Sequence, residues 1–298
     1  AGVAIDASEA ISRYGSVTQY AARATRGAIH DMETLMEAQV TLTEHYSALR
    51  VEGGKTERQF TALTALMEGL GVSSQTQTEN MDLMARSHGL YSDQIVGNSM
   101  EMLAISHALG KDSNEVANDF RLAQSMMAYD AKKTMEVFKG MQAVSKATGM
   151  SQSDLNSTFG QSMDTFDGAA SVAGRLNAAL GVQINAVELL QADEVERMQI
   201  IRQAFEDSGR DIEDLQGKEG KFIRDMIGKP LGMDREQVGR FFRMDPAEFE
   251  QHINEINRAS EQVTPFGSEG NIDAQLEALK KMYINKMGPV QRAEQAQL

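Results

Sequence analysis

Residues 1–229 contain no proline, because all four prolines of this 298-residue chain lie from Pro230 onward. Proline inside a helix removes a backbone hydrogen bond and clashes with the preceding turn, so nothing in this long stretch is barred from helix on that ground. Apolar residues also recur at spacings of three and four through most of it, which is the period of a helix face. We therefore predict an all-α chain with no sheet.

A recurring glycine pattern predicts where helices end. Five stretches place an apolar residue five positions before a glycine and, in all but one, a Ser or Asp two positions after it. Glycine just past a helix adopts the left-handed conformation without a Cβ clash, and Ser or Asp caps the helix that follows. We call these glycines elbows and expect a bundle of helical hairpins hinged at them. They are Gly71, Gly110, Gly149, Gly181 and Gly232.

The spacing of the elbows is regular only at first. Gly71, Gly110 and Gly149 are equally spaced, and the later intervals differ. This fits a degenerate helical-repeat array or a bundle with recurrent turns, and we favour the bundle. After Gly181 the capping box is displaced to Asn185 and Glu188. The expected helices cover residues 56–70, 74–87, 92–109, 113–147, 152–165, 168–180, 186–207, 211–228, 235–243, 246–262 and 271–286.

The first 52 residues carry a helical pattern long enough to need a partner. A helix of roughly 45 residues is about 65 to 70 Å long at 1.5 Å per residue, more than one small domain covers. Its narrow, alanine-rich seam suits a coiled coil or a neighbouring subunit. A helix folded back on its own chain, broken near Gly15 or Gly27, is the equal alternative. The positions expected to contact another chain are Ile11, Tyr14, Val17, Met32, Leu35 and Leu42.

Changes in composition divide the chain into four regions. A long helix is followed by a hairpin bundle, then by a small C-terminal helical subdomain, and finally by a terminal helix with a frayed tail. A charged stretch with three glycines, residues 206–220, predicts the loop or linker that opens the subdomain. The expected regions are residues 1–52, 55–207, 208–262 and 271–298.

The composition narrows the classes of partner. The net charge of -14 disfavours nonspecific binding to nucleic acid or to an anionic membrane. The absence of cysteine excludes disulfides, thiolate metal sites and cysteine nucleophiles. No run approaches the roughly 20 apolar residues of a membrane span. The composition names no partner, and we expect no membrane segment in the visible sequence.

Motifs for nucleotide or metal binding are weak. The GGKT stretch at Gly53 to Thr56 matches only the end of a phosphate loop, whose first glycine would fall at Leu49, and no strand pattern precedes it. The histidines are scattered without the spacing of a zinc helix. They are His30, His45, His88, His107 and His252. We expect no metal and no cofactor.

One carboxylate cluster was considered as a site for acid–base chemistry. Asp193, Glu194 and Glu196 lie close together, and the next turns hold Arg197 and Arg202. Opposite charges at such spacing are typical of a solvated helix face, and we predict that the cluster is one. We find no other catalytic constellation, so we expect no enzyme and no small-molecule substrate.

The elbows also resemble the turn of a DNA-binding helix-turn-helix. The second helix of that motif needs Lys or Arg for phosphates and bases. Only DREQVGRFFR, after Gly232, carries several arginines, and two acids accompany them. A nucleic-acid-binding or regulatory helical protein is therefore an alternative function, with this helix as its candidate site.

Three stretches together carry a family resemblance over residues 100 to 245. They are GMSQSDLNSTF, AGRLNAALGVQINAVELLQADEVERMQIIRQAF and GKFIRDMIGKPLGMDREQVGRFF. Their succession resembles the helical regions of tail tape-measure-like structural proteins of tailed bacteriophages. The resemblance implies a non-enzymatic virion component, made in the host cytoplasm and placed in the tail. It implies a homo-oligomer whose other partners are virion proteins.

The chain departs from that family in being short and in lacking an apolar membrane-like segment. Another internal virion or scaffold protein is accordingly the second alternative. The resemblance carries no catalytic residue to this sequence.

Overall fold

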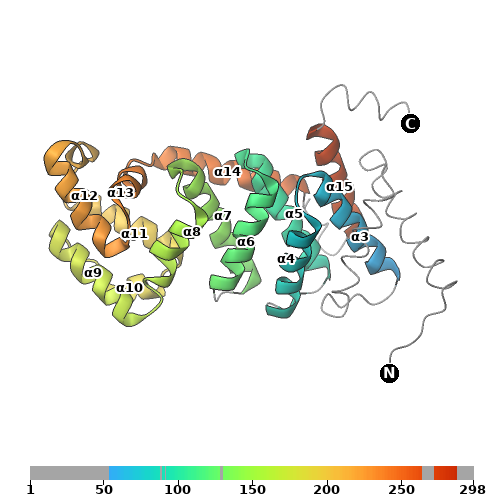
Figure 1. Cartoon of the computed structure of the whole chain (residues 1–298), viewed down its shortest axis with the longest axis horizontal. Coiled ribbons are helices and arrows are strands. Elements are labelled where there is room, and N and C mark those ends of the chain that lie inside the picture. The colour runs from blue at the N-terminus through green and yellow to red at the C-terminus, as the bar shows by residue number, and fades with distance from the viewer. Residues whose placement is uncertain (1–53, 88, 91, 128–129, 264–271, 287–298) are drawn as a thin grey trace. The chain divides into compact units, whose positions relative to one another are not determined.

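The computed structural model describes residues 54–87, 89–90, 92–127, 130–263 and 272–286 (Figure 1). Every regular element within those ranges is a helix, so the all-α prediction is confirmed for the residues that the structure describes. The long helix predicted over residues 1–52 lies outside them. So do its predicted contact positions, Ile11, Tyr14, Val17, Met32, Leu35 and Leu42.

The described residues form two compact units, separated after Arg121 and after Glu255. Helix α15 packs against α3 and α5 within unit 1. The helices of unit 1 are α3 (Gly54–Gly69), α4 (Ser74–Ser87), α5 (Ser92–Leu109), α15 (Ile272–Lys286), the start of α6 (Ser113–Met126) and the end of α14 (Pro246–Val263). A separate subdomain over residues 208–262 stays a prediction.

Unit 1 buries several polar side chains of α4. Asn80 is fully buried, and its amide donates to the carbonyl of Ala117 at 2.8 Å. The Gln77 amide donates to the carbonyls of Val72 at 2.8 Å and Thr64 at 3.2 Å. A buried amide is tolerated when its hydrogen bonds are made, which explains how the polar sequence of α4 reaches the core.

Unit 2 contains the remaining helices, from the end of α6 to the start of α14. Its core includes a cluster of aromatic rings. The ring centroids of Phe159 and Phe241 are 5.0 Å apart, and those of Phe205 and Phe242 are 4.6 Å apart. The elements are α7 (Ala131–Thr148), α8 (Gln152–Leu155), the π-turn η1 (Asn156–Gln161), α9 (Phe166–Leu180), α10 (Ala186–Gln191), α11 (Glu194–Asp207), the 3-10 turn η2 (Ile212–Leu215), α12 (Gly217–Leu231) and α13 (Arg235–Phe242).

The elbow glycines follow helices and have positive φ angles: 96° at Gly71, 59° at Gly110, 67° at Gly149, 74° at Gly181 and 69° at Gly232. After three of them, the next amide donates to the carbonyl five residues earlier, as in a Schellman motif: at Gly71, Gly110 and Gly232. Gly149 and Gly181 donate to the carbonyl four residues earlier, which is the simpler αL cap. Hinged hairpins at these glycines stay a prediction.

Two of the predicted helices are each divided in two. The predicted helix 113–147 is interrupted before Asp130, whose carboxylate accepts the amides of Lys132 and Lys133 and starts α7. The predicted helix 186–207 is interrupted at Ala192, after which α11 begins. At both breaks a capping side chain starts the second helix, and no glycine marks the end of the first. The glycine pattern therefore missed both breaks.

Three other boundaries differ from prediction. The helix expected over residues 152–165 turns into a π-turn at Asn156. The loop expected over residues 206–220 contains η2 and the first turn of α12. Pro230 lies inside α12, which was expected to end at residue 228. A proline in the last turn removes one backbone bond and disturbs the preceding turn, but no further turn follows that it could interrupt.

Candidate functional site

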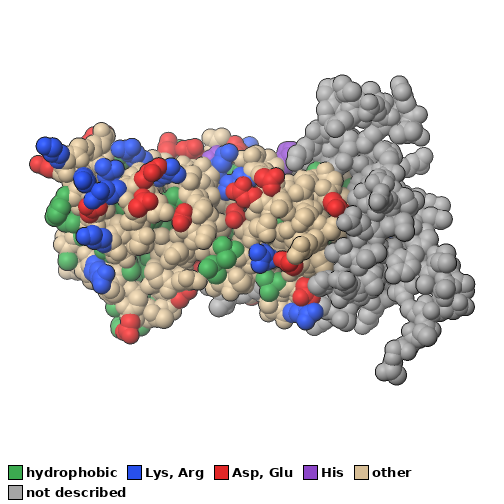
Figure 2. Space-filling model, viewed as in Figure 1, with side chains coloured by type: hydrophobic (Ala, Val, Ile, Leu, Met, Phe, Trp, Pro, Cys, Tyr) green, Lys and Arg blue, Asp and Glu red, His purple; other side chains and the backbone are tan. Residues whose placement is uncertain are grey.

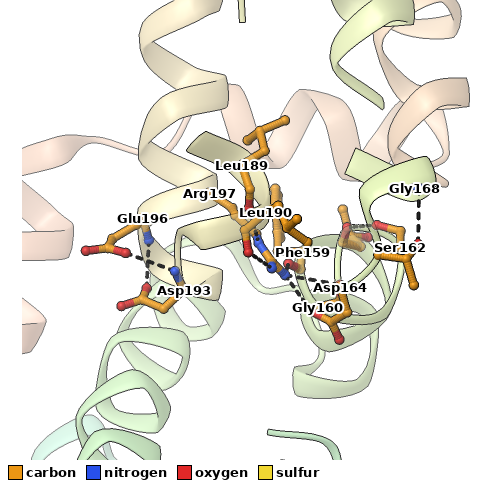
Figure 3. A network of polar contacts seen from close by, with 12 residues as sticks. Phe159, Gly160, Ser162, Asp164, Gly168, Leu189, Leu190, Asp193, Glu196 and Arg197 are labelled. Atoms are coloured by element: carbon orange, nitrogen blue, oxygen red, sulfur yellow. Dashed lines mark hydrogen bonds and ion pairs between the residues drawn. The ribbon is translucent and has the colours of Figure 1, made fainter. Parts of the chain in front are cut away.

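Arg197, near the start of α11, is the centre of a buried polar network in unit 2 (Figure 3). Its side chain is only 3% exposed. Its Nε donates to the carbonyl of Leu189 at 2.8 Å, and its Nη2 donates to that of Leu190 at 3.3 Å. Its Nη1 donates to the carbonyls of Phe159 at 2.7 Å and Gly160 at 3.2 Å. All three nitrogens are therefore used inside the fold, and we call this arrangement the Arg197 clamp.

The clamp joins two pieces of backbone whose regular helical hydrogen bonding is interrupted. Leu189 and Leu190 lie near the end of α10, where carbonyls lack helical partners. Phe159 and Gly160 belong to the π-turn, where the ordinary i to i-4 pattern is broken. A guanidinium supplies several donors in a fixed plane, so one side chain ties η1, α10 and α11 together.

Asp164 supplies the clamp's negative charge. Its Oδ1 accepts from Nη1 of Arg197 at 2.8 Å, but its side chain is 48% exposed. The carboxylate is thus in contact with solvent on one side and with a buried cation on the other.

The first turn of α11 is fixed by a capping box. Asp193 accepts the amide of Glu196 at 2.9 Å, and Glu196 accepts the amide of Asp193 at 2.9 Å. Lys133 of α7 pairs with Asp193 at 2.8 Å. This hydrogen bond raises the pKa of the Lys133 ammonium.

The predicted solvated face at this turn is wrong. Asp193, Glu194 and Arg197 are 7%, 4% and 3% exposed, respectively, and only Glu196 of the three carboxylates faces solvent. The prediction placed these residues in the middle of one long helix. They are instead the start of a new helix, packed under the end of α10.

Helices α7 and α11 approach closely beside this turn. A Cβ added at Gly140 would lie 2.6 Å from Cγ2 of Val195, a distance that packed carbon atoms do not tolerate. The start of α11 is therefore positioned by the Arg197 clamp on one side and by α7 on the other.

The break between α10 and α11 opens a groove on the surface of unit 2. Two adjoining hollows of ≈ 610 and ≈ 390 Å³ share Glu188, Gln199 and Ile200. The described lining residues include three carboxylates, those of Glu188, Glu196 and Asp207, and no Lys or Arg. Apolar, amide and acidic side chains line this α10–α11 groove together.

Besides the carboxylates, the lining contains apolar and amide side chains. Val187 is 46% exposed beside the groove, and Ile200 lies on the facing helix. Amides are placed among them, including Asn185, which caps α10 by accepting the amide of Val187 at 2.9 Å. An apolar strip with an acidic margin is suited to contact with another chain.

The described residues offer neither a metal-binding cluster nor a membrane-spanning helix. Among them, no group of three or more His, Asp or Glu side chains is placed to hold a metal ion. No helix in the described ranges has both the length and the apolar character needed to cross a membrane.

The candidate DNA-reading helix uses its arginines inside unit 2. Arg235 donates to both carboxylate oxygens of Asp225, at 2.5 and 2.6 Å. Arg240 donates to the Gly149 carbonyl at 3.1 Å and pairs with Glu236. Arg235 and Arg240 therefore have protein partners, whereas Arg243 of the same stretch is exposed, so two of the three arginines are less available for reading bases.

The structure does not gather the sequence-predicted residues into one site. The contact positions of residues 1–52 lie outside the described ranges, and the elbow glycines each sit at a different helix end. Sequence analysis missed the groove because it predicted one helix over 186–207. The Asp193 to Glu196 capping-box spacing is the signal that could have revealed the break.

Comparison with known protein families, with curated proteins and with solved structures found no match.

Proposed function

We propose that the chain is a non-enzymatic assembly protein that binds other protein chains through its helices. The α10–α11 groove is the observation that carries this proposal. It is open to solvent and combines apolar with acidic side chains, whereas small-molecule sites enclose the ligand and converge polar groups upon it. In the buried Arg197 clamp, the guanidinium nitrogens already donate to backbone carbonyls of the fold.

We further propose a place for this function in the tail of a phage virion, as a tape-measure-like component. The support is the sequence resemblance over residues 100 to 245. In this proposal the glycine elbows hinge helical hairpins, residues 1–52 form an assembly seam, and the partners are further copies and other virion proteins. In this proposal the chain is synthesised in the host cytoplasm before it joins the particle.

Molar mass in solution tests the assembly proposal. Light scattering is measured on the full chain and on a version lacking residues 1–50, each across a wide range of concentration. We expect the full chain to form a defined or concentration-dependent oligomer. A monodisperse monomer at every concentration, for both versions, would contradict self-assembly.

Mass spectrometry of purified particles tests the location. Tails are isolated from a lysate of the phage or prophage whose genome encodes the chain. We expect its peptides to co-purify with intact tails through a density gradient. Their recovery only in the soluble fraction would count against a virion position.

A further inference from the structure

Helix α12 carries an exposed aromatic residue within a line of charges. Phe222 is 66% exposed, more than the other exposed large apolar side chains of the described residues. Lys218, Phe222, Asp225 and Lys229 are spaced by four, three and four residues, which aligns them along one side of the helix. The opposite side is buried, with Ile227 at 0% exposure.

The charge of this surface is positive. Asp225 is engaged by Arg235 through two hydrogen bonds, at 2.5 and 2.6 Å. Lys221 lies on one flank of the line and Glu219 on the other, both exposed. Figure 2 shows Lys and Arg side chains gathered over α12 and α13, with acidic side chains among them. We call Lys218, Lys221, Phe222 and Lys229 the α12 face.

The α10–α11 groove is complementary to the α12 face in charge. One offers carboxylates without a cation among its described lining residues, and the other offers lysines around a protruding ring. The larger hollow, ≈ 610 Å³, has room for an aromatic side chain. The exposed Val187 beside it gives the ring an apolar neighbour.

We propose that the α12 face of one copy docks in the α10–α11 groove of a second copy. In this contact Phe222 inserts beside Val187, and the lysines face Glu188 and the other carboxylates of the groove. The inference rests on the proposed assembly function and names the contact that performs it.

The contact is head-to-tail. The two surfaces share no residue, although both belong to unit 2, so each copy offers one of each. A heterologous contact of this kind closes into a ring or continues as a filament. A second copy is the favoured occupant because every copy supplies both the acidic groove and the lysines of the α12 face.

Single variants of the full chain provide the first test. Phe222→Ala and Glu188→Lys are each compared with wild type by sedimentation equilibrium. We expect each to weaken self-association by about tenfold or more, as central aromatic and charged contacts do. Association of the wild type should also weaken as salt is raised.

Matched controls separate the contact from general surface effects. Phe166→Ala removes another aromatic residue that is 58% exposed, and Glu250→Lys reverses an exposed acid on α14. Both are expected to associate as wild type does. Circular dichroism melting curves verify that all four variants are folded, and the charge exchange Glu188→Lys with Lys221→Glu is expected to recover part of the lost association.

Mixing the two single variants tests the head-to-tail geometry. Phe222→Ala retains the groove and Glu188→Lys retains the α12 face, so the mixture has one intact contact between unlike copies. Native mass spectrometry distinguishes the variants by mass. We expect 1:1 pairs of unlike variants in the mixture at concentrations where neither variant pairs with itself.

The outcomes distinguish the contact from the function. If the wild type associates and both variants match it, the contact is overturned while self-assembly stands. Weakening by Glu188→Lys without weakening by Phe222→Ala overturns it also, and assigns the groove to another segment. A wild type that never associates overturns both proposals.

Discussion

Two arginines of unit 2 show how differently the same ion pair is used. Arg197 pairs with Asp164 at 2.8 Å, and Arg235 pairs with Asp225 at 2.5 Å. The shorter pair has the exposed arginine, since the side chain of Arg235 is 48% exposed and that of Arg197 only 3%. Distance alone would rank them in the wrong order of importance.

The difference lies in what else each guanidinium touches. Arg197 donates to four backbone carbonyls as well as to Asp164, so its loss would leave buried acceptors unpaired. Arg235 bonds to Asp225 at the surface, where water replaces either partner. Burial and the number of acceptors left behind decide the energetic weight of a pair.

Removing the buried arginine gives the largest expected effect. Arg197→Met keeps much of the apolar stem but removes every guanidinium hydrogen bond to the carbonyls of the clamp, of which that of Gly160 keeps the Met163 amide as a donor. We expect a loss of about 3 to 5 kcal/mol in the free energy of unfolding, typical of a broken buried charge network, measured by urea denaturation. Arg235→Met is the matched exposed control, and an equal loss in both variants would refute the comparison.

The second effect concerns Gly149, whose carbonyl accepts from a third arginine, Arg240. Gly149 has a φ of 67°, so Gly149→Ala should cost about 1 to 2 kcal/mol in unfolding free energy, because a Cβ is disfavoured in that conformation. Gly174 in α9 has open space around its Cα. Gly174→Ala should be neutral or stabilise by up to about 1 kcal/mol.

The melting temperatures of Arg240→Ala and Gly149→Ala are compared by thermal melting. The side chain of Arg240 is 48% exposed, and we expect its loss to shift the melting temperature less than Gly149→Ala does. A larger shift would mean that an exposed arginine-to-carbonyl bond outweighs backbone conformation at this elbow.

Asp164→Asn is expected to have a smaller effect than either. The carboxylate is 48% exposed, and the carbonyls still hold Arg197 after the charge is removed. We expect a loss of about 1 kcal/mol or less in unfolding free energy, measured by urea denaturation beside Arg197→Met. A loss as large as that of Arg197→Met would show that the carboxylate, and not the backbone, holds the clamp.

Asp225→Asn should have the smallest effect. At neutral pH we expect a small fall in melting temperature, less than that of Asp164→Asn, because both partners of the pair are accessible to water. The hydrogen bond from Arg235 lowers the pKa of Asp225 below its ordinary value. A lowered pKa in the folded state stabilises the protein above the unfolded pKa of about 3.9, and this contribution is lost as pH falls through the folded value.

Melting curves of wild type and Asp225→Asn from pH 7 to pH 2 check that sign. Any advantage of the wild type must shrink on acidification. An advantage that grows as pH falls would mean that the carboxyl is stabilised in its protonated form.

The sequence predicted the helical class well because its signals are local. Proline placement and apolar spacing act within a few turns, and Asp234 with Gln237 makes the capping box that its spacing indicates. The breaks before Asp130 and at Ala192 were missed because no glycine marks them. At both breaks the only local sequence signal is the Asp that caps the second helix, and a Ser or Asp in a polar sequence is a weak signal.

The Arg197 clamp could not be predicted from the sequence. Its acceptors are carbonyls from residues 159, 160, 189 and 190, and carbonyls carry no side-chain identity to recognise. The charge pattern around Arg197 is that of a solvated helix, and only tertiary packing reverses that interpretation. The groove depends on the break at Ala192, so the prediction of one helix over residues 186–207 left it undetected.

The π-turn at Asn156–Gln161 makes the clamp sensitive to insertion and deletion. A π-turn holds one more residue than the α-helical turn it replaces. Deleting the exposed Ser157 would allow an ordinary α-helical turn, whose carbonyls accept amides four residues later. The wide turn that leaves carbonyls of this segment available to Arg197 would then be lost. Evolution or engineering is thus free to exchange the side chain at 157, but the number of residues between α8 and Arg197's acceptors is fixed.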